Sequence, residues 1–171
     1  AEESEPKGSD SLIRSRLANF YPNRRATFQA RAQTGGNDSH VEFGFVKEDF
    51  LGNVPAVTLS TSSATVVRGA KSFGLAVRSP DVDGWNVVSG GTDGTNRSAV
   101  TTRVAERGWA SFLVAVNEQG ETRLWLNGQH DNTFARRTDM HTTQGHYLWL
   151  HAVRGLLSVD YIQAWQERTP L

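Results

Sequence analysis

The stretch that most constrains the fold is residues 109–128, WASFLVAVNEQGETRLWLNG. Bulky apolar residues occupy every second position on both sides of the central NEQG, namely Phe112, Val114 and Val116 before it and Leu124 and Leu126 after it. A period of two on both sides of a short loop predicts a β-hairpin in which Gly120 takes a positive φ. Asn127 and Gly128 predict a second tight turn, because Asn tolerates and Gly prefers the left-handed region. We expect this hairpin to lie at the centre of a β-sheet.

Strand-like segments separated by turns continue through most of the chain from residue 26 onward. They are residues 27–32, 40–46, 56–59, 65–68, 73–78, 85–88, 100–104, 147–152 and 156–165. The segments between them are rich in Gly, Asp, Asn, Ser and Pro, which favour turns. About ten to twelve short strands, with no helix of about ten residues inside the domain, predict an all-β sandwich or jelly roll.

The first 25 residues differ from the rest, so we divide the chain into an N-terminal arm at 1–25 and a β-sandwich domain at 26–171. Residues 1–10, AEESEPKGSD, are polar and typical of a flexible arm. Residues 11–20 predict a short helix with Ser11 as N-cap. The side chains expected to attach the arm to a neighbouring subunit are Leu12, Ile13, Arg14, Arg16, Leu17, Phe20 and Tyr21.

Composition narrows the classes of function. A chain of 171 residues suits one domain, and its formal net charge of zero argues against a nucleic acid or an anionic membrane as partner. Neither a signal-peptide pattern at the start nor an apolar run near the ~20 residues that cross a bilayer is present. The absence of cysteine removes disulfides, thiol nucleophiles and sulfur ligands for metals.

Several segments resemble a known superfamily. Residues 112–128, with their strand, turn, aromatic strand and Asn-Gly, resemble a unit of concanavalin A-like lectin/glucanase and laminin G-like domains, and GLLSVDYIQAWQER at 155–168 resembles their last strand. VEFGFV at 41–46, followed by VPAV at 54–57, is similar to a strand of tailed-phage surface proteins. The resemblance implies an antiparallel two-sheet jelly-roll sandwich with one concave sheet, a fold that hosts lectins, hydrolases, lyases and virion decoration proteins alike.

Catalysis is the alternative with the least support. A glycoside hydrolase needs two carboxylates about 5–10 Å apart, and no strand here places two acids on one face. Glu42 is the single acid of its strand. A polysaccharide lyase would need a Tyr, a His and a Gln together, for which Tyr147, His151 and Gln163 are the candidates.

Metal binding has little support in the sequence. The five histidines include no pair two residues apart on a strand, so zinc is not expected. The loops Asp81–Gly84 and Thr92–Asn96 have the oxygen-rich chemistry that calcium prefers, but Asx-turns explain both loops without an ion. We therefore expect no cofactor, with calcium as the alternative.

Sugar binding requires aromatic platforms beside amide and guanidinium donors. Arg123, Trp125 and Asn127 share one face of their strand, Trp149 shares a face with His151 on another, and Gln163 shares a face with Trp165 on a third. If these faces lie on the concave sheet, they form a groove of Trp, Arg, Asn and Gln. Trp85 follows a polar turn and is expected to be the most exposed tryptophan. The alternative is that these tryptophans belong to the core between the sheets.

The sequence thus favours a non-catalytic virion surface protein, a capsid decoration or head-fibre subunit. Its arm would bind capsid or other virion subunits, its sandwich would face solvent and touch glycans, and it would form a homo-oligomer. The first alternative is a secreted carbohydrate-binding module or lectin. The second is a polysaccharide lyase or hydrolase that depends on Glu42 or His151.

Overall fold

The computed structural model describes residues 11–34, 39–47, 55–60, 63–66, 72–80, 82–91, 97–101, 108–130, 132–153 and 157–168. The strands are β1 (Ser11–Arg14), β2 (Ala26–Thr34), β3 (His40–Val46), β4 (Val57–Ser60), β5 (Ser63–Val66), β6 (Phe73–Ser79), β7 (Val82–Gly90), β8 (Arg97–Thr101), β9 (Trp109–Val116), β10 (Glu121–Leu126), β11 (Ala135–Arg136), β12 (Tyr147–Val153) and β13 (Leu157–Trp165). A single turn of 3-10 helix, η1 (Pro22–Arg24), precedes β2.

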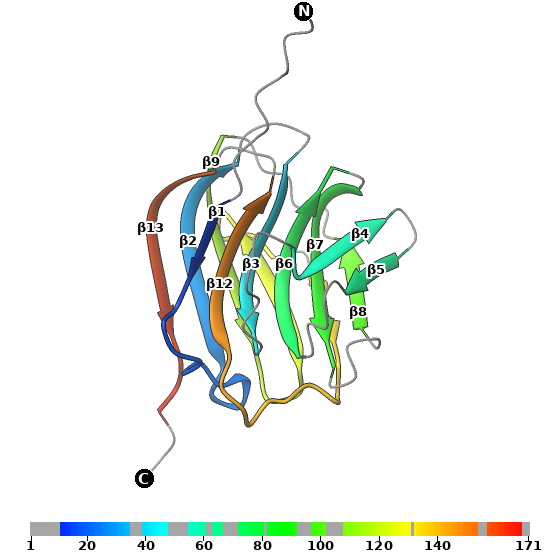
Figure 1. The fold of residues 1–171 in the computed structure, drawn as a ribbon, viewed down its shortest axis with the longest axis vertical. Coiled ribbons are helices and arrows are strands. Elements are labelled where there is room, and N and C mark those ends of the chain that lie inside the picture. The colour runs from blue at the N-terminus through cyan, green and yellow to red at the C-terminus, as the bar shows by residue number, and fades with distance from the viewer. Residues whose placement is uncertain are drawn as a thin grey trace, which may run out of the picture.

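The strands form two antiparallel sheets that stack face to face (Figure 1). The six-stranded sheet has the order β1-β12-β3-β6-β7-β8, and the five-stranded sheet has the order β11-β10-β9-β2-β13. Strands β4 and β5 form a separate two-stranded hairpin over the β6–β8 side of the six-stranded sheet (Figure 1). The predicted all-β, two-sheet jelly-roll sandwich is confirmed.

The hairpin predicted at residues 109–128 forms. Strands β9 and β10 pair in a register that places Val116 opposite Thr122, and β9 is the central strand of its sheet. Gly120 has φ 71°, and the Asn117 side chain closes the loop by accepting the N–H groups of Gln119 and Glu121. Asn127 and Gly128 both take positive φ, as a two-residue turn with right-handed strand twist requires.

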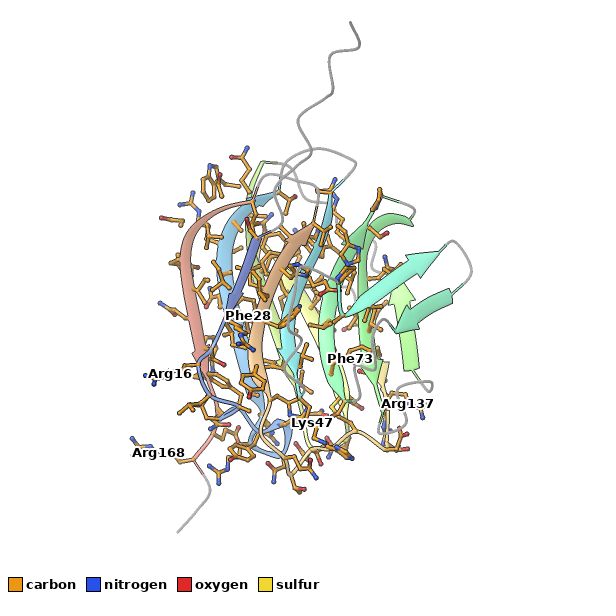
Figure 2. All side chains as sticks on the ribbon, in the orientation of Figure 1. Arg16, Phe28, Lys47, Phe73, Arg137 and Arg168 are labelled. Carbon is orange, nitrogen blue, oxygen red and sulfur yellow. The ribbon has the colours of Figure 1, made fainter. Side chains whose placement is uncertain are left out.

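An aromatic cluster between the sheets makes the main core. Phe43 stacks on Phe112 with ring centres 4.7 Å apart. The ring centre of Phe28, which Figure 2 labels, lies 6.0 Å from that of Phe43. Trp85 is 1% exposed and lies 4.8 Å from Phe112. The prediction of an exposed Trp85 is therefore wrong, because Trp85 pairs with Arg78 and lies with Val87 on the face of β7 that points into the core.

A second apolar cluster covers the opposite face of the six-stranded sheet. Phe73, Leu75 and Trp149 contribute to it from the sheet, and Val57 and Leu59 contribute from the hairpin that lies above. Because both faces of this sheet are buried, β3 and β6 are almost continuous runs of buried residues. The five-stranded sheet differs, since β9 and β10 alternate strictly between buried and more exposed positions.

The N-terminal segment is a strand where the sequence predicted a helix. Residues 11–14 pair antiparallel with β12, from Ser11 opposite Ala152 to Arg14 opposite Trp149. Pairing with β12 supplies backbone hydrogen bonds that an isolated ten-residue helix would have to form without tertiary support. Residues 11–14 are therefore part of the six-stranded sheet, although the sequence assigned them to a separate arm.

Candidate functional site

The outer face of the five-stranded sheet carries the most exposed aromatic surface of the described domain. Trp109 on β9 and Trp165 on β13 are 43% and 45% exposed on this face, and Trp125 on β10 is half-buried. The strand register places outward side chains in rows across the sheet. One row reads Trp165, Thr27, Ala115 and Arg123, and the next reads Gln163, Gln29, Leu113 and Trp125.

A hollow of about 370 Å³ lies over the first of these rows. Its floor is Thr27 and Ala115, whose small side chains leave a depression between the larger Trp165 and Arg123 at either end of the row. Trp125 from the next row closes one side. The hollow thus arises from residue size along one cross-strand row.

A second hollow of about 280 Å³ lies further along the same strands. It is lined by Gln29, Ser111, Phe112, Leu113, Trp125 and Gly128. Among the described lining residues, Trp125 is the one that the two hollows share. His130 stacks on the Trp125 ring with centres 4.7 Å apart and holds the indole in place.

Paired charges surround the first hollow. Arg25 Nη1 lies 3.1 Å from Glu167 Oε1, and Arg25 Nε lies 3.7 Å from Glu118 Oε2. Arg123 Nη2 lies 3.2 Å from Glu121 Oε2. The pKa of Glu118 is lowered by hydrogen bonds from its own backbone N–H and the Gln119 amide and by the charge of Arg25. This carboxylate therefore stays charged and accepts hydrogen bonds. A glycosidase general acid needs the opposite shift.

The predicted sugar-binding residues divide between the two sheets. Arg123 and Trp125 lie on the exposed face, as their alternation indicated. Asn127 lies in the adjacent turn, where its Oδ1 accepts the Ser111 N–H at 2.9 Å. Trp149 and His151 are both fully buried on the other sheet, so the expectation that they form part of an open groove is wrong. Val57 and Leu59 of β4 lie in the same apolar cluster as Trp149, and Leu12 of β1 packs against that cluster.

Glu42 lies at the centre of that buried region. Its Oε1 accepts the Val57 N–H at 2.9 Å and lies 3.1 Å from His40 Nε2. Its Oε2 accepts the Ala56 N–H at 3.0 Å and the Trp149 indole N–H at 2.7 Å. The carboxylate thereby fastens the start of β4 to the sheet.

The electrostatics of this cluster match a structural role. Burial raises the pKa of Glu42, but the neighbouring histidines and the Ala56 N–H favour its charged form more strongly and hold the pKa at about 2. His151 Nδ1 lies 3.7 Å from Glu42 Oε2, and among the described residues neither ring nitrogen of His151 has a hydrogen-bond partner. Both side chains are 0% exposed, so the substrate contact that the enzyme alternatives required is absent in this conformation.

The predicted lyase trio does not assemble. Tyr147 and His151 lie on β12 in the six-stranded sheet, whereas Gln163 lies on β13 in the five-stranded sheet. The sequence placed these residues on strands correctly, but it gave no information on which strands share a sheet.

A buried serine–histidine contact that the sequence did not signal joins three segments. Ser72 Oγ lies 2.9 Å from His146 Nε2 and accepts the His141 N–H at 3.0 Å. His146 also forms a two-way backbone bridge with Phe20. Burial lowers the pKa of His146 to about 4, so the ring is neutral at pH 7. Both Ser72 and His146 are inaccessible to a substrate, and their contact orients the turn that precedes β6.

The side chains expected in the N-terminal arm are partly used within the domain. Leu12 packs on the second apolar cluster, and the ring centres of Phe20 and Phe45 are 5.4 Å apart. The Tyr21 backbone N–H donates a hydrogen bond to the Gln166 side-chain oxygen. Ile13 and Leu17 are 43% and 64% exposed. Arg14 lies over the Tyr147 ring, and Arg16 lies at the edge of the domain (Figure 2).

Within the described ranges, no group of three or more His, Asp or Glu side chains could hold a metal ion. Asp81 and residues 92–96, where the sequence offered calcium as an alternative, lie outside the described residues. A search of the described helices finds none long and apolar enough to span a membrane.

Comparisons with known proteins support the fold. No protein-family model matches the sequence, and no curated protein matches it. Solved structures do match, and the chain therefore has the lectin-like jelly-roll sandwich as its fold class. The carbohydrate recognition domain of Emp47p is similar with a TM-score of 0.62 and 10% identity, over 95% of this chain and 80% of that one.

Two further structures share the arrangement. The carbohydrate-binding module CBM66 from Bacillus subtilis aligns with a TM-score of 0.52 and 10% identity, over 92% of this chain and 82% of the module. A glycosyl hydrolase family protein from Mycobacterium fortuitum aligns with a TM-score of 0.55 and 10% identity, over 90% of this chain and 68% of that protein. At these identities the similarity establishes architecture.

Proposed function

We propose that this chain is a non-catalytic glycan-binding β-sandwich whose binding face is the outer face of the five-stranded sheet. The observation that carries the proposal is the hollow between Trp165 and Trp125, with guanidinium and carboxylate groups at its rim. Two of the similar structures are a carbohydrate recognition domain and a carbohydrate-binding module, which supports the same class of function.

The chemistry of the face suits a sugar ring. Indole faces pack against the C–H groups of a pyranose, and polar groups beside them fix the orientation of the ligand. Arg25 and Arg123 donate hydrogen bonds to ring hydroxyls, and Glu118 accepts them. The small floor residues Thr27 and Ala115 allow the ring to approach the sheet.

A polysaccharide panel with paired tryptophan variants tests this proposal. Affinity electrophoresis should show retardation of the native chain by at least one polysaccharide, which Trp125→Ala and Trp165→Ala each abolish. Trp109→Ala is the matched control, because Trp109 is nearly as exposed as Trp165 on the same face but lines neither hollow. Equal loss in all three variants, or no retardation by any polysaccharide, contradicts the proposal.

Our second proposal is that the chain attaches to a larger assembly, as the virion surface role predicted from the sequence requires. We infer that Ile13 and Leu17 form the contact with capsid or other subunits, because they are exposed apolar side chains beside the exposed Arg14 and Arg16. The localisation that follows is the surface of a virion, with a secreted lectin as the alternative.

The oligomeric state, measured by light scattering, distinguishes a subunit of an assembly from an isolated binding module. A homo-oligomer of the native chain that dissociates in the double variant Ile13→Ser, Leu17→Ser supports attachment through this segment. A native chain that remains monomeric at high concentration, or a double variant that assembles unchanged, argues for an isolated binding module.

A further inference from the structure

The two hollows follow each other along the same pair of strands. The first lies over Thr27 and Ala115, which are paired in the sheet, and the second lies over Gln29 and Leu113, the next outward pair. One such step along a strand is about 7 Å. Trp125 lines both hollows and therefore stands at their junction.

Each guanidinium group of the first hollow is paired with a carboxylate. Arg25 is paired with Glu118 and Glu167, and Arg123 is paired with Glu121. The described residues around this hollow thus bring two guanidinium groups and three carboxylates, and they offer no excess positive charge to a uronate or sulfate. A sugar hydroxyl both donates and accepts, so it can bond to either partner of an ion pair without a net charge.

The second hollow has no charged group among its described lining residues. Gln29 and Ser111 line it with an amide and a hydroxyl group, and the apolar Leu113 lies opposite Gln29 in the sheet. The Gln29 Nε2 donates to the Tyr161 hydroxyl at 3.0 Å, which fixes the amide and leaves its carbonyl oxygen as an acceptor for a ligand hydroxyl. An uncharged ligand suits this lining better than an ionic one.

We propose that the ligand of this face is an uncharged oligosaccharide of at least two sugar units that runs along β2 and β9, with one unit in each hollow and Trp125 between them. This inference rests on the proposed glycan-binding function and adds the charge class, the minimum length and the direction of the ligand.

Calorimetric titration with neutral and anionic ligands of matched length tests the inference. The probes are cello-, malto- and mannooligosaccharides of one to six units, with oligogalacturonides of the same lengths as the anionic set. A neutral series should bind at least tenfold more tightly as a disaccharide or trisaccharide than as a monosaccharide. Its affinity should change less than twofold between 50 and 500 mM NaCl, because no ion pair forms with the ligand.

Two variants separate the hollows. Trp165→Ala alters the first and Gln29→Ala the second, and each should remove most of the gain from the added sugar unit. Binding that depends on Trp125 but favours oligogalacturonides, or is as tight for the monosaccharide, overturns this inference and leaves the proposed function standing. An absence of Trp125-dependent binding to any probe overturns both.

Discussion

Trp125 and Trp165 line one hollow although two strands separate β10 from β13 in the sheet. Neighbouring strands lie about 4.8 Å apart, so the two backbones are on the order of 14 Å from each other. The indoles line a common depression because the intervening strands present Thr27 and Ala115 rather than long side chains. The binding face therefore depends on two small residues as much as on two large ones.

Filling this depression should block binding without unfolding the domain. Ala115→Leu places a branched side chain on the floor of the first hollow, and we expect at least a tenfold loss of glycan affinity. Ala115 points outward, so the free energy of unfolding should change by no more than about 0.5 kcal/mol. Calorimetric titration and urea denaturation measure the two quantities. Glycan affinity equal to that of the native chain would exclude the first hollow as a subsite.

Mild acid should destabilise the protein through His146. Its pKa is about 4 in the folded chain and near 6.5 when unfolded, so the unfolded state binds more protons between these values. The free energy of unfolding should therefore fall by about 2 kcal/mol from pH 7 to pH 5 on account of this residue. Urea denaturation at both pH values measures the change, and His146→Gln should remove most of it. A native chain that is equally stable at both pH values would contradict this account.

Glu42→Gln should weaken the attachment of the β4–β5 hairpin. In this variant an NH₂ group replaces one of the two carboxylate oxygens, which together face four hydrogen-bond donors. The donors that face the NH₂ group then have no acceptor, although they are buried. We expect a loss of about 3 kcal/mol in stability and faster hydrogen exchange at the Ala56 and Val57 amides. Glu167→Gln is the control, because its carboxylate is exposed and its ion pair contributes little. Unchanged exchange at both amides in Glu42→Gln would show that the carboxylate does not hold the hairpin.

Two glycines with similar backbone angles should respond differently to alanine. Gly120 has φ 71° and a Cβ there would collide with the Arg137 carbonyl oxygen, whereas Gly128 has φ 76° and open space around it. Gly128→Ala should cost only the left-handed backbone, about 1 kcal/mol, and Gly120→Ala should cost more than about 2 kcal/mol. Thermal denaturation of the pair measures the difference. Equal costs would indicate that the segment after β11, which carries Arg137, moves aside without cost.

The strands were predictable where alternation was strong. His40–Val46 and the β9–β10 hairpin match their predicted bounds or nearly so, because apolar residues at every second position leave one choice of face. Residues 11–14 were predicted as helix because ten residues carry little periodic information, and the edge of β12 decided their state. Trp85 was likewise predicted as exposed because a polar turn precedes it, but the pairing of β7 with β6 places it in the core.

The site was predictable only in part. Arg123 and Trp125 were identified because both are on the outward face of one strand, and Trp165 was identified with Gln163 on a face of another strand. The sequence did not show that these two strands share a sheet, and it did not place Arg25 beside them. Those contacts depend on the pairing of β13 with β2, a long-range relationship that no local pattern specifies. Trp149 and His151 follow the same alternation as Trp125, and a separate hairpin buries them. Alternation assigns a face to a side chain, but it does not say what covers that face.

The most direct test of the binding face is a ¹⁵N-resolved NMR titration of the five tryptophan indole N–H signals with the glycan that binds. The account predicts that the signals of Trp125 and Trp165 shift on saturation, while those of the buried Trp85 and Trp149 stay unchanged. A shift of Trp149 with Trp125 and Trp165 unmoved would place the ligand on the six-stranded sheet and contradict the central claim.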